Sequence, residues 1–280
     1  MAALQSIRPA VSGVVRNPIL VAVTALFGLS QLPNLLVQPG QPILAGVLSL
    51  ATFGVMVLAL PFFQGGVLGM ASEALAGRTS LGTLVATGKA NYVSLLLGYF
   101  VLLALNLVFG FVTFMGVLIA VVGGSVGGVD AASGFGANTT LLVVAAIVGV
   151  GLLLAYIVVT VFIQFYAHAV VLDGTDLVAG FRRSAGLVRS NLLSVIGYTV
   201  ILGAGSLLVG TLAAAASFVF TPQPPGSPAV SLISIDQTPA LLVAGAVGYI
   251  LLTGVFGALY ATYSVAFYER ISPGPVAGDA

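Results

Sequence analysis

The chain of 280 residues is 59% hydrophobic and only 5% charged. Eight basic and seven acidic side chains are too few to solvate a soluble protein of this length, whereas lipid in a bilayer covers an apolar exterior. The absence of cysteine excludes disulfide bonds and thiolate metal sites, and the lack of a dense basic patch argues against binding to nucleic acid.

Residues 3–16 form the first predicted element, a short helix in the membrane interface. Apolar side chains recur at helical spacing, and a polar stripe follows another face (Arg8, Ser12 and Arg16). Apolar runs at residues 18–37 and 42–75 follow, and each is long enough as a helix to cross the hydrocarbon core. Pro61 predicts a kink in the second span.

The next segments repeat this order. Residues 79–89 predict a second interfacial helix, because Leu81, Leu84 and Val85 share one of its faces. Spans three and four are predicted at residues 92–122 and 140–172, joined by an outer loop rich in Gly, Ala and Ser.

The third interfacial helix has the clearest pattern of the three. Thr175 is predicted as its N-cap and Asp176 falls in its first turn, while Leu177, Phe181, Ala185 and Val188 share a face. Spans five and six are predicted at residues 192–220 and 240–267. The Pro- and Gly-rich tail at residues 272–280 is predicted to be disordered.

The distribution of basic residues predicts the orientation in the membrane. All Lys and Arg residues flank alternate gaps between the apolar runs, and the remaining three gaps contain none. This pattern predicts a multi-pass protein of the cell membrane with both termini in the cytoplasm. The basic helices are expected to face membrane lipid through Arg8, Arg16, Arg78, Lys89, Arg182, Arg183 and Arg189. On the opposite side, Asn138 begins an Asn-Thr-Thr pattern whose glycosylation the sequence leaves open.

Together these elements predict an all-α, polytopic membrane fold with six transmembrane helices and three short amphipathic helices. Residues 1–271 would form a single domain with a threefold internal repeat, whose units cover residues 1–76, 77–173 and 174–271. Equivalent junctions would be marked by three asparagines (Asn17, Asn91 and Asn191) and three acidic residues (Glu73, Asp173 and Glu269).

No Asp, Glu, Lys or Arg lies deep within a predicted span, which argues against a proton- or ion-coupled carrier. A candidate polar path consists of Gln64, Asn106, Gln164 and His168. These side chains would line a path or a headgroup pocket between helices. The alternative, which the sequence favours, is hydrogen bonding between helices, with His168 as a neutral hydrogen-bonding group rather than a pH sensor.

Glu73, Asp173 and Glu269 form a candidate acidic cluster at the inner ends of the returning spans. If the repeat holds, the three carboxylates would surround a central axis and bind a cation or a cationic headgroup. In the alternative, which the sequence favours, they cap the interfacial helices or pair with the nearby cations Arg78, Lys89, Arg189 and Arg270. We therefore assign no metal ion and no cofactor.

Two motifs carry a resemblance to a known family. The stretch FYAHAVVLDGTDLVAGFRRSAGLVRSNLLSVIGY at Phe165–Tyr198 and AFYERI at Ala266–Ile271 resemble a broad group of uncharacterised six-span membrane proteins of archaea and bacteria. That group is related to the membrane domain of some glycerophosphoryl diester phosphodiesterases. The resemblance implies an all-helical membrane fold and no catalytic residue, because the phosphodiesterase chemistry belongs to a separate soluble domain.

The sequence contains no nucleophile elbow, phosphate-binding loop or His-Glu metal motif, so we expect no enzymatic activity. The leading hypothesis is a non-catalytic membrane module that organises membrane lipid or a protein partner at the cytoplasmic surface. The alternative is a channel or facilitator for a small or lipidic substrate, lined by the candidate polar path.

Overall fold

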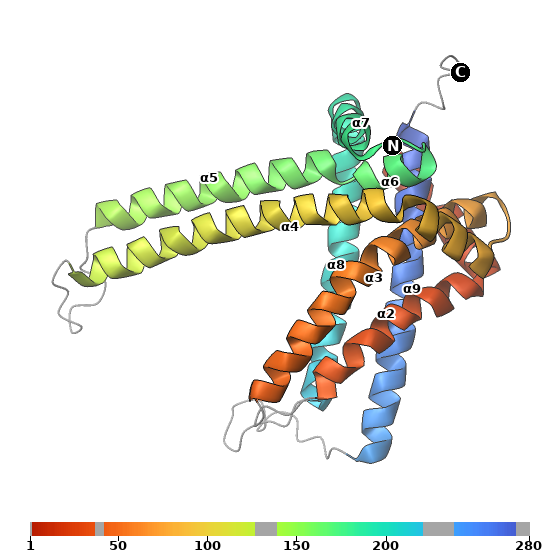
Figure 1. The fold of residues 1–280 in the computed structure, drawn as a ribbon, viewed down its shortest axis with the longest axis horizontal. Helices are drawn as coiled ribbons and strands as arrows, with labels where there is room; N and C mark the ends of the chain where they lie inside the picture. The colour runs from red at the N-terminus through yellow and green to blue at the C-terminus, as the bar shows by residue number, and fades with distance from the viewer. Residues whose placement is uncertain (1, 37–41, 127–138, 221–237, 273–280) are drawn as a thin grey trace.

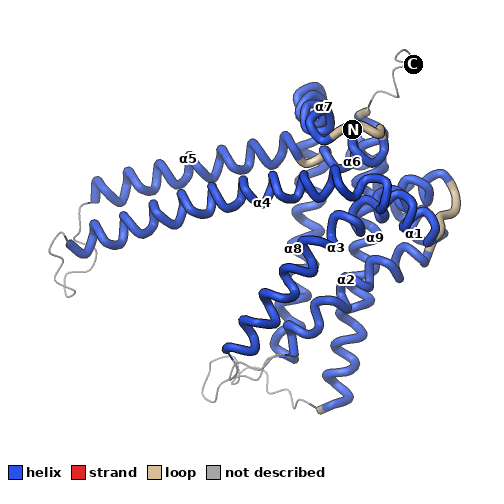
Figure 2. Tube along the Cα trace, in the orientation of Figure 1, coloured by secondary structure: helices blue, strands red, loops and turns tan. Residues whose placement is uncertain are grey.

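The computed structural model describes residues 2–36, 42–126, 139–220 and 238–272, and all regular structure in these ranges is α-helical (Figure 2). Asn138 and residues 273–280 of the predicted tail lie outside these ranges. The described helices are α1 (Ala2–Arg16), α2 (Pro18–Leu36), α3 (Pro42–Ala76), α4 (Leu81–Val126), α5 (Thr139–Ile163), α6 (Tyr166–Leu172), α7 (Leu177–Ser190), α8 (Leu192–Phe220) and α9 (Pro239–Ile271).

Several described helices are long and apolar enough to cross a membrane. Five meet this condition alone, and the number is six if α1 and α2, which meet at 90°, count as one bent span. The turn between α1 and α2 falls at Asn17, the residue before Pro18, where the proline ring disfavours helical geometry. The all-helical membrane fold predicted from the sequence is therefore confirmed.

Two local predictions are wrong. The second interfacial stretch is not a separate helix, because α4 continues through it without a break and no proline interrupts the junction. The predicted fourth span is present, but a turn after Ile163 divides it into α5 and the short α6. The N-cap of α7 is Asp176 rather than Thr175, since the Asp176 side chain accepts a hydrogen bond from the Ala179 amide.

The long helices separate into two groups (Figure 1). Helix α9 packs against α1, α2, α3 and α8, and these elements form the main bundle. Helices α4 and α5 pack on each other and extend together away from that bundle (Figure 1). Helices α1, α6 and α7 gather with the C-terminal end of α9 at one end of the bundle, which we call the basic end because α1 and α7 carry most of the cations.

The best-packed part of the molecule lies at the basic end. Every residue from Ala261 to Tyr268 of α9 is buried, and side chains of α1, α6, α7 and α8 pack around this stretch. Toward the opposite end, the helices expose many large apolar side chains, as expected of surfaces that face lipid.

Small residues allow the backbones of α2 and α9 to approach closely. A Cβ atom added to Gly254 of α9 would lie 2.7 Å from the carbonyl oxygen of Val21 in α2. The Thr24 hydroxyl also donates to the Gly254 carbonyl at 2.6 Å. The contact combines small-residue packing with an interhelical hydrogen bond, the two means by which helices associate in lipid.

Candidate functional site

The basic side chains are concentrated at the basic end and point outward. Seven of the eight Lys and Arg residues are exposed, and Arg183 is half-buried. Within the described part of the chain, the salt bridge between Arg183 and Asp173 is the only one. Arg189 lies over the Phe162 ring at 5.7 Å, and Arg270 donates to the Gln5 side chain at 3.1 Å. This end therefore presents a cationic surface with few internal counter-charges.

Asp173, Arg183 and Tyr268 connect three elements at this surface. The Nε atom of Arg183 in α7 lies 2.6 Å from Oδ2 of Asp173, which follows α6. The Tyr268 hydroxyl of α9 donates to the same oxygen. The hydrogen bond to Tyr268 and the charge of Asp173 raise the pKa of Arg183. The guanidinium also donates to Ser272 at 2.9 Å, so this arginine fastens α7 to the end of α9.

The break between α5 and α6 is closed by a serine of α7. The Ser184 hydroxyl donates to the Phe162 carbonyl at 2.7 Å and accepts from the Phe165 amide at 3.0 Å. Ser184 is fully buried, so it satisfies two backbone groups that a continuous helix would have paired. The broken span thus depends on α7 for its local hydrogen bonds.

His168 is a buried link between α6 and α9. Its Nε2 atom forms a hydrogen bond with the Ser264 hydroxyl at 3.0 Å, and that hydroxyl also lies 2.9 Å from the Ala261 carbonyl oxygen. The tautomer of the imidazole decides which atom of the His168–Ser264 pair donates, and Nδ1 is buried without a partner among the described residues. The imidazole stacks on Tyr268 at 5.3 Å. These contacts favour the structural role for His168.

The other members of the candidate polar path are Asn106, Gln64 and Gln164, and their side chains have different surroundings. Asn106 of α4 is exposed, and its Oδ1 accepts from the Tyr156 hydroxyl of α5 at 2.8 Å. Gln64 and Gln164 each keep one buried amide atom unpaired within the described ranges, Oε1 in Gln64 and Nε2 in Gln164. The structure thus places Asn106 between α4 and α5, and His168 between α6 and α9.

The three acidic residues of the candidate cluster have separate partners. Glu73 accepts from the hydroxyls of Thr79 and Thr83 and so joins the end of α3 to the start of α4. Glu269 accepts from Ser72 at 2.9 Å, while Asp173 binds Arg183. In the described part of the chain, no group of three carboxylate or histidine side chains is placed to hold a metal ion. The four cations predicted as partners (Arg78, Lys89, Arg189 and Arg270) form no salt bridge there.

The asparagines that mark the predicted repeat share one local bond and differ beyond it. Asn17, Asn91 and Asn191 each donate to the carbonyl four residues earlier. Among the described residues, Asn17 alone of the three also has tertiary partners, since it donates to the Gly77 carbonyl and accepts from the Thr79 amide. Asn17 therefore fastens the α1–α2 turn to the α3–α4 turn.

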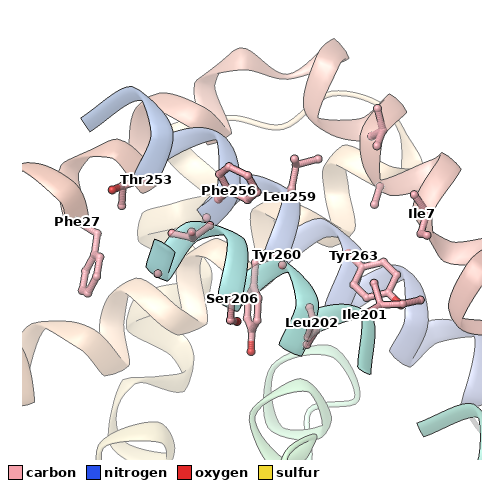
Figure 3. A pocket seen from close by; sticks show the side chains of 16 residues that line it. Ile7, Phe27, Ile201, Leu202, Ser206, Thr253, Phe256, Leu259, Tyr260 and Tyr263 are labelled. Carbon is pink, nitrogen blue, oxygen red and sulfur yellow. The ribbon is translucent and has the colours of Figure 1, made fainter. Parts of the chain in front are cut away.

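A groove on the side of the bundle is the site that sequence reasoning missed. It has a volume of about 620 Å³ and lies between α8 and α9, with α2 at one end and α1 at the other. Ile7 and Tyr263 lie near one end of the groove, and Phe27 and Thr253 lie near the other (Figure 3). Its lining is almost entirely apolar; the polar groups are the hydroxyls of Ser206, Thr253, Tyr260 and Tyr263.

Helix α8 contributes one continuous face to this groove, through Ile201, Leu202, Gly205, Ser206, Val209 and Gly210. These residues recur at the spacing of a single helical face. The sequence did not reveal the face because α8 is apolar all round, so its pattern cannot distinguish a groove from a lipid-facing surface. Gly205 and Gly210 on this face were the one sequence feature that could have indicated the groove, since a glycine leaves space that a side chain would otherwise fill.

Comparison with known proteins identifies a family, but no individual protein that matches the chain. No curated protein and no solved structure matches the chain, so the resemblance to the membrane domain of phosphodiesterases depends on the sequence motifs alone. Residues 1–271 match the model of a family described as a domain of unknown function, DUF7847. The match covers all nine described helices, and the chain therefore belongs to the DUF7847 family.

Proposed function

We propose that this protein is a non-catalytic membrane module whose basic end binds anionic lipid of the cytoplasmic leaflet and organises lipid or a protein partner there. The observation that carries the proposal is the set of exposed cations at one end of the bundle, among which no salt bridge is found in the described ranges. Anionic headgroups are the natural counter-charges for such a surface, at about 1 kcal/mol for each Lys or Arg near the membrane.

The proposed orientation agrees with the positions of the elements. Helix α1 and the end of α9 contact each other at the basic end, through Ser6 and the Ala266 carbonyl at 3.3 Å. Both ends of the described chain would then lie on the cytoplasmic side of the cell membrane. The resemblance of the two sequence motifs to the membrane domain of glycerophosphoryl diester phosphodiesterases would fit the same view, because such a domain would position activity at a membrane without supplying catalytic residues.

The proposal is tested by exchanging charge at six exposed cations. One variant replaces them with glutamine, and its control exchanges Arg for Lys and Lys for Arg at the same positions (Arg8, Arg16, Arg78, Lys89, Arg182 and Arg189). Each protein is purified from membranes, and the co-purified lipids are quantified by mass spectrometry. We expect the glutamine variant to lose its enrichment in anionic lipid while the control keeps it. Equal enrichment in both variants would reject the proposal.

The alternative function is a channel or facilitator for a small or lipidic substrate. The observation in its favour is the pair of unpaired buried amide atoms in Gln64 and Gln164, which would become partners for a polar solute. Flux of small solutes into proteoliposomes distinguishes the two functions. Flux that Gln64→Leu abolishes would support transport, and an absence of flux would leave the membrane module.

A further inference from the structure

The groove between α8 and α9 has the features of a specific lipid site. It is open to the surface, since Tyr260 is 55% exposed and Phe27 is 44% exposed. We propose that it binds one anionic glycerophospholipid of the leaflet at the basic end, with a hydrocarbon chain along α8 and the phosphate beside Arg8. This inference deepens the proposed function and depends on its assignment of the basic end to a membrane interface.

The lining of the groove matches a hydrocarbon chain. Its volume of about 620 Å³ falls in the range of small-molecule sites, roughly 300–1,000 Å³. Apolar cavities do not retain water, because water needs several polar partners. Within a bilayer, the chains of neighbouring lipids are the apolar groups available to fill a groove that opens sideways.

The position of α1 argues for a lipid rather than another transmembrane helix. Helix α1 meets α2 at 90°, and its Ile7 and Val11 line the groove at the basic end. A spanning helix in the groove would meet α1 and could not continue past it. A lipid chain, in contrast, ends at this level in a glycerol and a headgroup.

Tyr263 supplies the polar contact that a lipid would need at this level. The residue is only 6% exposed, and its buried hydroxyl has no hydrogen-bond partner among the described residues. It lines the groove near Ile7, at the end toward α1 (Figure 3). The oxygen that links a lipid chain to glycerol, in an ester or an ether, is an acceptor placed just below the headgroup. The hydroxyl is covered in this structure, so a turn of the side chain toward the groove would be needed before a hydrogen bond to that oxygen could satisfy it.

Arg8 supplies the complementary charge for the headgroup. It follows Ile7 in α1 and lies one turn from Val11, both of which line the groove. Arg8 is exposed and forms no salt bridge within the described part of the chain. In the proposed complex, its long side chain would extend toward the end of the groove from the adjoining face of α1, and its guanidinium would stay in the interface and bind the phosphate. We therefore assign an anionic rather than a neutral headgroup.

The test uses the full chain in nanodiscs that contain phosphatidylglycerol with a photoactivatable group on one acyl chain. Cross-linked peptides are mapped by mass spectrometry. Gly205→Phe fills the groove from α8, and Gly203→Phe is the matched control on the same helix outside the lining. No atom lies within 4 Å of a Cβ added at either glycine, so the first atom of the new side chain has space at both positions.

We expect labelling of the groove segments 201–210 and 253–263. Gly205→Phe should lower this labelling about tenfold, whereas Gly203→Phe should preserve it. Tyr263→Phe should lower it about fivefold, as expected for a single lost hydrogen bond. Arg8→Gln should weaken labelling by phosphatidylglycerol and leave labelling by a phosphatidylcholine analogue unchanged.

Equal labelling of the groove segments in both glycine variants would overturn the inference, and so would equal labelling of the wild type by the phosphatidylcholine analogue. These failures differ from failure of the proposed function. If only the groove site is wrong, the glutamine exchange of the six cations still removes the overall enrichment in anionic lipid. If the proposed function is wrong, that enrichment persists in the exchange variant.

Discussion

Tyr268 and Asp173, which lie 95 positions apart, meet at the basic end, where the tyrosine hydroxyl donates to the same carboxylate oxygen that binds Arg183. The contact joins the two motifs of the sequence, because Asp173 follows FYAHAVVL and Tyr268 lies within AFYERI. Phe165 of the first motif also packs against Phe267 of the second at 5.8 Å. The motifs are therefore two halves of one packed contact between α6, α7 and α9.

Breaking this contact should destabilise the protein. Tyr268→Phe removes one hydrogen bond to a partly exposed carboxylate, and we expect a loss of about 1–2 kcal/mol in the free energy of unfolding. Asp173→Ala should cost about 2 kcal/mol, because it leaves both Arg183 and Tyr268 without the shared acceptor. Chemical denaturation in detergent measures both values, and a double-mutant cycle gives their coupling.

Glu269→Gln is the control for the loss of a carboxylate. Glu269 is exposed and accepts from one neutral hydroxyl, so its exchange should change the stability by less than about 0.5 kcal/mol. If Asp173→Ala changes the free energy of unfolding as little as this control does, the contact of Asp173 with Arg183 and Tyr268 does not stabilise the fold, and the prediction is wrong.

Ser184→Ala should be unusually costly for a serine substitution. It removes the hydroxyl that pairs with both the Phe162 carbonyl and the Phe165 amide at the break between α5 and α6. Because these groups are buried, we expect a destabilisation of about 1–3 kcal/mol. Ser190→Ala on the same helix is the control, since exposed Ser190 donates to carbonyls of its own helix and accepts from the adjacent Asn191 side chain, with no bond to another helix among the described residues. Equal effects on the unfolding midpoint would contradict the bridging role of Ser184.

The spans could be predicted from the sequence because lipid dictates their length and apolar character. The second predicted span differs from α3 by one residue at its end, and the fifth coincides with α8. The break before α6 could not be predicted, because Gln164 and Phe165 carry no helix-breaking signal. It depends on Ser184, whose position is decided by tertiary packing.

Some features of the candidate site could likewise be predicted from the sequence, and others could not. The gathering of cations at one end could be predicted, because the alternation of basic gaps along the chain decides it. The groove could not, since Gly205 and Ser206 lie in a helix with no polar face to orient them. The partners of Glu73 could not be predicted either, since it binds the hydroxyls of two threonines near the start of α4 rather than a cation.

Asn17→Ala should destabilise the protein more than Asn191→Ala, although each of these asparagines donates to the carbonyl four residues earlier. Asn17 is 3% exposed and holds the Gly77 carbonyl and the Thr79 amide, so its loss leaves two partly buried backbone groups unpaired. We expect a destabilisation of about 1–3 kcal/mol. Asn191→Ala should cost less than about 1 kcal/mol, because Asn191 bonds within its own turn. Thermal unfolding in detergent compares them, and equal costs would show that the tertiary bonds of Asn17 are dispensable.

Gly254→Ala should weaken the contact between α2 and α9. The added methyl group would lie 2.7 Å from the Val21 carbonyl oxygen and 2.9 Å from the Ala25 Cβ, so the two helices must separate. Separation also lengthens the hydrogen bond from Thr24 to the Gly254 carbonyl, and we expect a destabilisation of about 1–3 kcal/mol. Gly248→Ala in the same helix meets no atom within 4 Å and should be neutral or stabilising, because alanine favours a helix over glycine by about 1 kcal/mol. Denaturation in detergent measures the difference between the two variants. If Gly254→Ala also proves neutral, α2 and α9 do not pack as closely as the structure places them, and the groove that they border would have a different shape.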